Sequence, residues 1–521
     1  MVTGYVIRKN EYHDSVFLMR VAKRLSEQKG ILQAAALMGT EKNKVLLEEI
    51  EVSDPEIWEA TPSDLIVAVK ADSQEALTTV LEDIERWLTM DLGSGAQYDI
   101  RMLDEAVALQ PHSNLAVISV PGSYAAREAR KALEHGLNVF LFSDNVPLES
   151  EIALKAYARE RGLIVMGPDC GTAIIGGKGI GFANSVRHGP IGVIGASGTG
   201  IQEFTTLVHR AGSGISHAIG IGSRDLSDAV GGISFLSALD ALESDKQTEV
   251  ITILSKPPGP LALSNLIPKI LQCHKPIVAC FLGLKQESLS TDIRHRTART
   301  LEDAAALALQ IVTGNLLPRF NAHSPRIQTL IQRERAGKNP EQRYLRGIFA
   351  GGTFCFQAQQ ILQDAGIAAH SNAPLHGNLR LANPMRREEH TLVDMGTDDF
   401  TLGKPHPMID SRLRRERILA EGQDPQVGIL LLDVVLGFNA SPDPAGELVS
   451  TIEEAKREAK KRGGSLSVVA SICGTEGDPQ NYPQQVKVLE EAGGIVFPSS
   501  AQAAQFCALL AASLSEGLDV K

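Results

Sequence analysis

The chain has 521 residues, 43% of them hydrophobic and 22% charged, and a formal net charge of −11. This length is too great for one hydrophobic core and predicts roughly three or four domains. No long basic block is present, which argues against a nucleic acid partner. No apolar run reaches the roughly 20 residues of a membrane span, and the first ten residues lack a signal-peptide core. We therefore expect a cytoplasmic protein with no membrane partner.

The cysteines are scattered along the chain and form no CxxC pair. This spacing argues against a zinc site and against a disulfide framework, so no metal is expected. The six positions are Cys170, Cys273, Cys280, Cys355, Cys473 and Cys507.

Residues 1–110 alternate short strand-like and helix-like segments, which predicts a small α+β domain. We expect strands at 5–8, 31–37 and 64–69, and helices at 14–28 and 73–88. The polar residues 89–113 are expected to form an irregular linker. The turn at 38–43 is a candidate for binding a ligand or a partner subunit.

From Leu115 onward, strands and helices alternate regularly, which predicts doubly wound parallel sheets. The fold class is therefore α/β, with several such domains after the α+β domain. A Rossmann-like portion is expected at 111–188, a flavodoxin-like domain at 189–320 and a further α/β domain at 344–521. The basic stretch 326–343 is expected to link the last two.

A glycine-rich turn joins the expected strand 191–194 to an expected helix at 201–208. Ser197 and Thr199 occupy positions typical of helix N-caps, and Gly198 and Gly200 allow a ligand to approach the backbone closely. Free N–H groups at a helix start bind anions, most commonly phosphate. The alternative is a capped helix start without a ligand.

Similar turns occur further along the chain. A second helix is expected to begin within 437–441, where Gly437 and Asn439 are candidate anion ligands. Gly351, Gly352 and Thr353 follow another short strand, and they either bind an anion or form a tight turn.

Further candidates lie where expected parallel strands end, because ligands of doubly wound folds bind at that edge. Thr172 is a candidate donor to a carbonyl or phosphoryl oxygen, and Lys256 is either a phosphate partner or a solvated surface residue. Arg224 either clamps a carboxylate or phosphate or forms a surface pair with the adjacent candidate Asp225. The remaining candidates at strand ends are Asp169, Cys170 (otherwise a small buried residue), Gly171 and Asp433 (otherwise a helix cap).

His406 lies between two prolines that hold the backbone extended. It is either an acid–base or orienting residue, or part of a rigid structural loop. A dinucleotide site is a further alternative for the turn at 195–200, with Asp225 on a ribose, but the glycine spacing departs from GxGxxG.

The order of these motifs resembles succinyl-CoA synthetase. Residues 115–315 look like its α subunit from the second strand onward, on the segments 167–171 and 192–200. Residues 391–510 look like the carboxyl-terminal domain of its β subunit. With an extra amino-terminal domain and no ATP-grasp domain, the whole chain resembles the FdrA family.

Two departures from succinyl-CoA synthetase bear on chemistry. The loop that carries its phosphorylated histidine is replaced by residues 283–288, and the nearby His295 is flanked by Arg294 and Arg296. The glutamate that orients that histidine is replaced by Lys256 and its neighbours, and a lysine there stabilises an anion directly.

The FdrA resemblance implies carbamoyl transfer between oxalurate and phosphate, which gives oxamate and carbamoyl phosphate, in allantoin and purine catabolism. It implies an oligomeric complex with other subunits, and phosphate or carbamoyl phosphate as substrate. In that fold two helix starts point at one phosphoryl group. Lys256, Thr172 and His406 are the candidate catalytic residues. CoA is a second candidate ligand; the alternatives are an ADP-forming acyl-CoA synthetase and a non-catalytic scaffold subunit.

Overall fold

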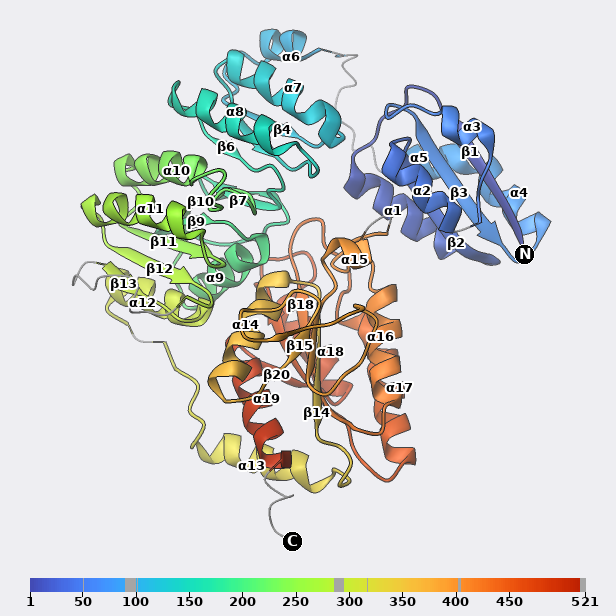
Figure 1. The fold of residues 1–521 in the computed structure, drawn as a ribbon, viewed down its shortest axis with the longest axis vertical. Coiled ribbons are helices and arrows are strands. Elements are labelled where there is room, and N and C mark those ends of the chain that lie inside the picture. The colour runs from blue at the N-terminus through green and yellow to red at the C-terminus, as the bar shows by residue number, and fades with distance from the viewer. Residues whose placement is uncertain are drawn as a thin grey trace. The chain divides into compact units, whose positions relative to one another are not determined.

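The computed structural model describes residues 1–49, 51–89, 100, 102–284, 295–315, 317–401 and 404–515. The chain forms two compact units, one of residues 1–168 with 400–410, the other of 169–399 with 411–521. Each unit is built from α/β layers, as expected (Figure 1). No helix of the described residues is long and apolar enough to cross a bilayer.

The first unit begins with a three-stranded antiparallel sheet in the order β1-β3-β2. Side chains alternate across a strand, so Leu65, Val67 and Val69 of the central strand lie in one apolar cluster and Ile66 and Ala68 in another. The expected α+β domain is thus confirmed. Its elements are β1 (Val2–Arg8), α1 (Ser15–Ser26), β2 (Ile31–Met38), α2 (Glu41–Glu49), α3 (Pro55–Glu59), β3 (Leu65–Ala71), α4 (Gln74–Glu82) and α5 (Ile84–Thr89).

A small parallel sheet in the order β4-β5-β6 follows in the same unit. Its elements are α6 (Leu103–Leu109), β4 (Leu115–Ile118), α7 (Gly122–Glu134), β5 (Asn138–Leu141), α8 (Leu148–Arg159) and β6 (Val165–Met166). The prediction of an irregular linker at 89–113 is wrong at α6, which packs Leu103 and Val107 against the apolar cluster of this sheet. Residues 90–99 and 101 of that linker lie outside the described residues.

The second unit contains two seven-stranded sheets (Figure 1). The first has the order β13-β12-β11-β9-β10-β7-β8, and its strands from β9 to β13 are parallel. Its elements are β7 (Thr172–Ile175), β8 (Lys178–Gly181), β9 (His188–Gly195), α9 (Gly198–Arg210), β10 (Ile215–Gly220), α10 (Ile233–Ser244), β11 (Val250–Ser255), α11 (Pro260–Gln272), β12 (Ile277–Phe281), β13 (His295–Thr297) and α12 (Leu301–Thr313).

Within this sheet, chain order and spatial order define a flavodoxin-like arrangement. If β9 to β13 are numbered 1 to 5 along the chain, they lie side by side in the order 2-1-3-4-5, so the strand order reverses at β9. The hairpin β7–β8 joins the same sheet through antiparallel pairing with β10. The expected boundary between residues 188 and 189 therefore falls inside this sheet.

The second sheet has the order β16-β15-β17-β14-β18-β19-β20 and its described pairings are all parallel. Counted from β14, the strands β17, β14, β18, β19 and β20 repeat the order 2-1-3-4-5. Its elements are β14 (Tyr344–Phe349), α14 (Gly352–Asp364), β15 (His370–Ser371), β16 (Leu379–Arg380), β17 (Thr391–Asp394), α15 (Asp398–Thr401), α16 (Arg412–Gln423), β18 (Val427–Val435), α17 (Gly446–Lys461), β19 (Ser467–Cys473), α18 (Tyr482–Glu491), β20 (Ile495–Phe497) and α19 (Ser500–Ser515).

Helix α13 (Pro325–Ala336) covers much of the stretch 326–343 that is expected to link the last two domains. Ser324 caps this helix, accepting a hydrogen bond from the N–H of Ile327 at 3.4 Å. Ile327 and Ile331 are buried, so the basic residues of this segment belong to the outer face of an amphipathic helix.

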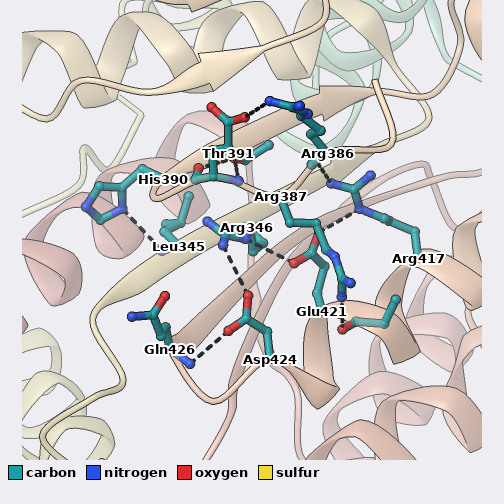
Figure 2. A network of polar contacts seen from close by, with 12 residues as sticks. Leu345, Arg346, Arg386, Arg387, His390, Thr391, Arg417, Glu421, Asp424 and Gln426 are labelled. Atoms are coloured by element: carbon teal, nitrogen blue, oxygen red, sulfur yellow. Dashed lines mark hydrogen bonds and ion pairs between the residues drawn. The ribbon is translucent and has the colours of Figure 1, made fainter. Parts of the chain in front are cut away.

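At the amino ends of β14 and β17 lies a buried ionic network (Figure 2). Arg346 Nε lies 3.0 Å from one carboxylate oxygen of Glu421, and Arg417 Nε lies 2.6 Å from the other. His390 accepts a hydrogen bond from the N–H of Leu345 at its Nδ1 (3.2 Å). Buried charges need such partners, and the network fixes α16 against the sheet.

Candidate functional site

Each of the two seven-stranded sheets has a glycine-rich turn at the carboxyl end of one of its inner strands. In the first sheet β9 runs into Ala196 and Ser197 before α9, and in the second β14 runs into Ala350 and Gly351 before α14. Both strands lie where the strand order reverses, which is the position at which doubly wound folds bind ligands.

These two turns are in direct contact. The hydroxyl group of Ser197 is hydrogen-bonded to the hydroxyl group of Thr353. A Cβ atom added at Gly200 would lie 3.4 Å from Cγ2 of Thr353, and one added at Gly351 would lie 3.1 Å from Cγ2 of Thr199. The glycines thus let α9 and α14 begin side by side.

The arrangement concentrates positive potential. Each helix start carries about half a positive charge and N–H groups without an intrahelical partner. Ser197 satisfies one of them, accepting from the N–H of Gly200 at 3.2 Å. Two positive helix ends in contact repel each other unless a negative group lies between or beside them, so the site favours an anion.

The expected second helix start at 437–441 is wrong. Helix α17 begins at Gly446, and the helix that faces Ser197 is α14. The turn after β18 instead binds the β8–β9 region, where Asn439 donates from Nδ2 to the carbonyl of Gly181 at 2.9 Å. Gly437 donates its N–H to Oε1 of Gln480 at 3.0 Å, so both residues fix loops.

Lys256 lies directly after β11, beside the turn that follows β9. Its side chain is exposed, and its Nζ lies 5.5 Å from the ring centroid of Phe356 in α14. The structure therefore brings this predicted residue to the edge where the two helix starts meet, with no described ion pair on its ammonium group. A cation here adds to the field of the helix ends.

Thr172 lies beside the first turn, but its expected role as a donor is corrected. Its hydroxyl group donates to the carbonyl of Phe182 at 2.6 Å, so the proton is already engaged. A Cβ atom at Gly198 would lie 3.0 Å from Thr172 Oγ1. Thr172 therefore shapes the turn and requires a glycine at 198.

Cys170 is buried, with its sulfur 3.4 Å from the carbonyl oxygen of Gly220. This agrees with the packing alternative rather than a nucleophile. Asp169 has a positive φ of 55° and accepts from the hydroxyl of Ser223 at 2.8 Å. Gly171 has open space where a side chain would lie.

Asp225 is corrected from a candidate ligand to a helix cap. Its carboxylate is fully buried and accepts from the N–H groups of Ser234 (3.1 Å) and Phe235 (2.9 Å) at the start of α10. These bonds occupy the carboxylate that a ribose would need, which argues against the dinucleotide alternative. Arg224, next to it, is half-buried in the loop after β10.

Asp433, near the carboxyl end of β18, is a buried support of the second turn. Its carboxylate accepts from the N–H groups of Ala350 (2.8 Å) and Gly351 (2.7 Å) and lies 2.7 Å from Nη2 of Arg414. Both carboxylate oxygens are bonded to protein groups, which agrees with a role in positioning the turn.

His406 belongs to the first compact unit, whereas the two helix starts belong to the second. Its Nδ1 accepts from the N–H of Met408 at 3.2 Å, and its carbonyl accepts from Ile409 and Asp410. These bonds agree with the structural-loop alternative. His295 is buried in β13 opposite Ile277, at the amino end of β12 and so at the sheet edge away from Ser197.

Sequence reasoning missed Asp394, which ends β17 next to the second turn. It is 5% exposed, and burial raises the pKa of its carboxyl group, while Lys256 opposes that shift. The available signal was a carboxylate at the end of an apolar run, the same signal that singled out Asp433.

Three parts of the chain match known families. Residues 186–282 match a family described as CoA binding domain, residues 348–510 one described as CoA-ligase, and residues 1–99 one described as AllF, heavy metal-associated domain. A succinate–CoA ligase (ADP-forming) α subunit from Methanothermobacter thermautotrophicus is 29% identical over 198 residues, which is 37% of this chain and 66% of that one.

The fold and these matches define a protein with CoA-binding and CoA-ligase domains of the succinyl-CoA synthetase type. YahF of Escherichia coli K12 is 41% identical over 501 residues, covering 96% of this chain and 97% of YahF. The chain belongs to the FdrA family.

Solved structures that resemble the chain include an acetyl-coenzyme A synthetase from Ca. Korarchaeum cryptofilum (18% identical, 78% of this chain and 85% of that one, TM-score 0.27). Another is an ATP citrate lyase from Methanothrix soehngenii (13% identical, 80% and 85%, TM-score 0.34). At these values neither likeness bears on function.

The residues of the first domain do not fit the metal that its family description names. Soft metals prefer thiolate ligands, and residues 1–99 contain no cysteine. Within the described part of the chain, no group of three or more His, Cys, Asp and Glu side chains is arranged to hold a metal. We derive no metal chemistry for this domain.

Proposed function

We propose that the chain is a subunit of an oxamate carbamoyltransferase complex, which binds phosphate, or the phosphate of carbamoyl phosphate, where α9 and α14 begin. The observation that carries this proposal is the contact between Ser197 and Thr353, because it brings two positive helix ends to one point. The match of residues 1–99 to the AllF domain supports a role in allantoin catabolism.

In this mechanism the N–H groups of Gly198, Thr199 and Gly352 and the ammonium group of Lys256 hold the phosphate. Their field stabilises the negative charge that develops on the carbamoyl oxygen when a phosphate oxygen attacks the carbamoyl carbon. Holding both reactants in one orientation supplies much of the remaining acceleration. Partner subunits supply the rest of the oxalurate site.

The decisive experiment isolates the affinity-tagged chain from its native host together with its bound partner proteins. The complex is given oxalurate and inorganic phosphate, and carbamoyl phosphate is measured. We expect formation that depends on phosphate and is lost in Ser197→Ala combined with Thr353→Val. An intact complex that forms no carbamoyl phosphate contradicts the proposal.

A second candidate, an ADP-forming acyl-CoA synthetase, is supported by the CoA binding and CoA-ligase matches. It would need a phosphate-carrying histidine near Lys256. His295 is placed at the opposite edge of the sheet, and residues 285–294 lie outside the described residues. Incubation with ATP, CoA and succinate, followed by assays for thioester and for acid-labile phosphate on the protein, separates the two candidates.

A further inference from the structure

Asp394 lies beside the start of α14. It is the last residue of β17 and pairs in register with Phe349, the last residue of β14, just before the turn that begins α14. One carboxylate oxygen, Oδ1, accepts from the N–H of Gly396 at 2.9 Å. The other, Oδ2, faces the helix start, since a Cβ atom added at Gly352 would lie 2.5 Å from it.

The two carboxylates beside this turn differ in their partners. Asp433 is neutralised by the guanidinium group of Arg414 and by two N–H groups. Asp394 is also buried, but within the described residues its carboxylate forms no ion pair and its Oδ2 accepts no hydrogen bond. Ionising a buried carboxylate that lacks an ion-pair partner is costly, which favours the protonated form of Asp394.

The charged groups around Asp394 act in opposite directions. Burial is the largest effect and raises the pKa of Asp394, and the carboxylates of Asp433 and Asp399 raise it further. The ammonium group of Lys256 and the backbone N–H of Gly396 lower this pKa. The net shift is upward. On α14, burial raises the pKa of the Cys355 thiol, so this group stays protonated near neutral pH. The protonated form of Asp394 can therefore stand next to an anion that an ionised carboxylate would repel.

We propose that Asp394 is the general acid–base residue of the carbamoyl transfer and transfers a proton between phosphate and the departing nitrogen. This proposal rests on the function proposed above. In phosphorolysis of oxalurate, a phosphate oxygen forms a bond to the carbamoyl carbon. The bond from this carbon to the oxamate nitrogen breaks, and its electron pair stays on the nitrogen. Asp394 Oδ2 gives that nitrogen a proton and regains one from the hydroxyl group of hydrogen phosphate.

A general acid is needed because an amide nitrogen leaves poorly as an anion. Correctly placed acids and bases contribute about 10²- to 10⁴-fold. In the reverse direction the same carboxylate accepts the proton from the attacking oxamate nitrogen and returns it to the departing phosphate. The assignment predicts that removing this proton affects turnover far more than phosphate binding.

The test compares Asp394→Asn with the wild-type complex and with Asp398→Asn, which changes an exposed aspartate four residues away. In Asp394→Asn we expect kcat for oxalurate phosphorolysis to fall about 100-fold or more, with the KM for phosphate within about threefold. The ionisation of Asp394 should disappear from the pH dependence of kcat. Asp398→Asn should retain wild-type kcat, KM and pH profile.

A turnover of Asp394→Asn within threefold of wild type overturns the assignment. A parallel loss of turnover, phosphate affinity and unfolding midpoint also overturns it, because it indicates a structural role. If the wild-type complex has no activity, the proposed function and the catalytic role of Asp394 have both failed, and calorimetry of inorganic phosphate binding then tests separately whether Asp394 titrates beside a bound anion. Wild type should then lose affinity relative to Asp394→Asn as the pH rises, and an unchanged ratio contradicts a titrating Asp394.

Discussion

The carboxylate of Asp433 accepts a hydrogen bond from the N–H of Gly351 at 2.7 Å and thereby ties the carboxyl end of β18 to the turn that begins α14. The same carboxylate lies 2.7 Å from Nη2 of Arg414, and both side chains are buried. One carboxylate thus serves as the counter-charge of Arg414 in α16 and as the support of the turn that begins α14.

Asp433→Ala should be strongly destabilising. It leaves the guanidinium group of Arg414 buried without a counter-charge and two N–H groups without acceptors, which costs about 3–5 kcal/mol. Urea unfolding measures the change, and Glu490→Ala, at an exposed glutamate of α18, should change stability by less than about 0.5 kcal/mol. An Asp433→Ala protein as stable as wild type would show that the Arg414 pair is not needed for the fold.

Ser197→Ala should lose both stability and phosphate affinity. Loss of the N-cap costs about 1 kcal/mol, and loss of the hydroxyl contact with Thr353 loosens the junction of α9 and α14. Ser324→Ala removes an equivalent cap from α13 in the same compact unit. Calorimetry with inorganic phosphate should show weaker binding in the first variant only; equal effects in both would mean that Ser197 acts only as a cap.

Gly352→Ala tests how tightly the second turn is packed. The added methyl group would lie 2.5 Å from Asp394 Oδ2, so this carboxylate must move away from the helix start. The methyl group also crowds the N–H of Gly352 that is proposed to hold the phosphate, so we expect phosphate affinity to fall about tenfold, equivalent to about 1.4 kcal/mol. The unfolding midpoint should change little because the neighbouring group is a side-chain end. Unchanged phosphate binding in a folded variant would place the anion elsewhere.

His390 should make the stability of the second unit pH-dependent. Burial, reinforced by the charge of Arg346, lowers the pKa of His390 to about 4 from its usual 6.5. The unfolded chain therefore binds a proton that the folded chain does not, and stability falls as the pH decreases from about 6.5 to about 4. His390→Asn, with an amide oxygen to accept from Leu345, should flatten this dependence by about 3 kcal/mol, as measured by urea unfolding across that range. The same slope in both proteins would show that His390 does not titrate in this way.

The alternation of strands and helices can be predicted from the sequence because short, β-branched apolar runs bounded by glycine-rich turns mark buried parallel strands. The start of α9 was found for the same reason, since Ser197 has the sequence signature of an N-cap. The partner helix was misassigned because Gly437 follows an apolar strand just as Gly351 does. Which of the two turns contacts Ser197 depends on how the two sheets pack, and this packing cannot be predicted from local sequence. The turn after β18 contacts Gly181 instead, through the side chain of Asn439. Thr172 and Asp225 failed as ligands for a similar reason, because nearby backbone groups already use their polar atoms.

Lys256→Gln provides an electrostatic test that leaves the fold intact. Its side chain is exposed at the carboxyl end of β11, so its contribution to anion binding is screened and amounts to about 1 kcal/mol. Phosphate affinity should fall about fivefold at low salt, and the difference from wild type should shrink as salt increases. Lys246→Gln removes an equally exposed lysine that precedes the amino end of the same strand, and should leave phosphate binding unchanged. Because parallel strands bind ligands at their carboxyl ends, equal losses in the two variants would indicate a general effect of net charge rather than a site where α9 and α14 begin.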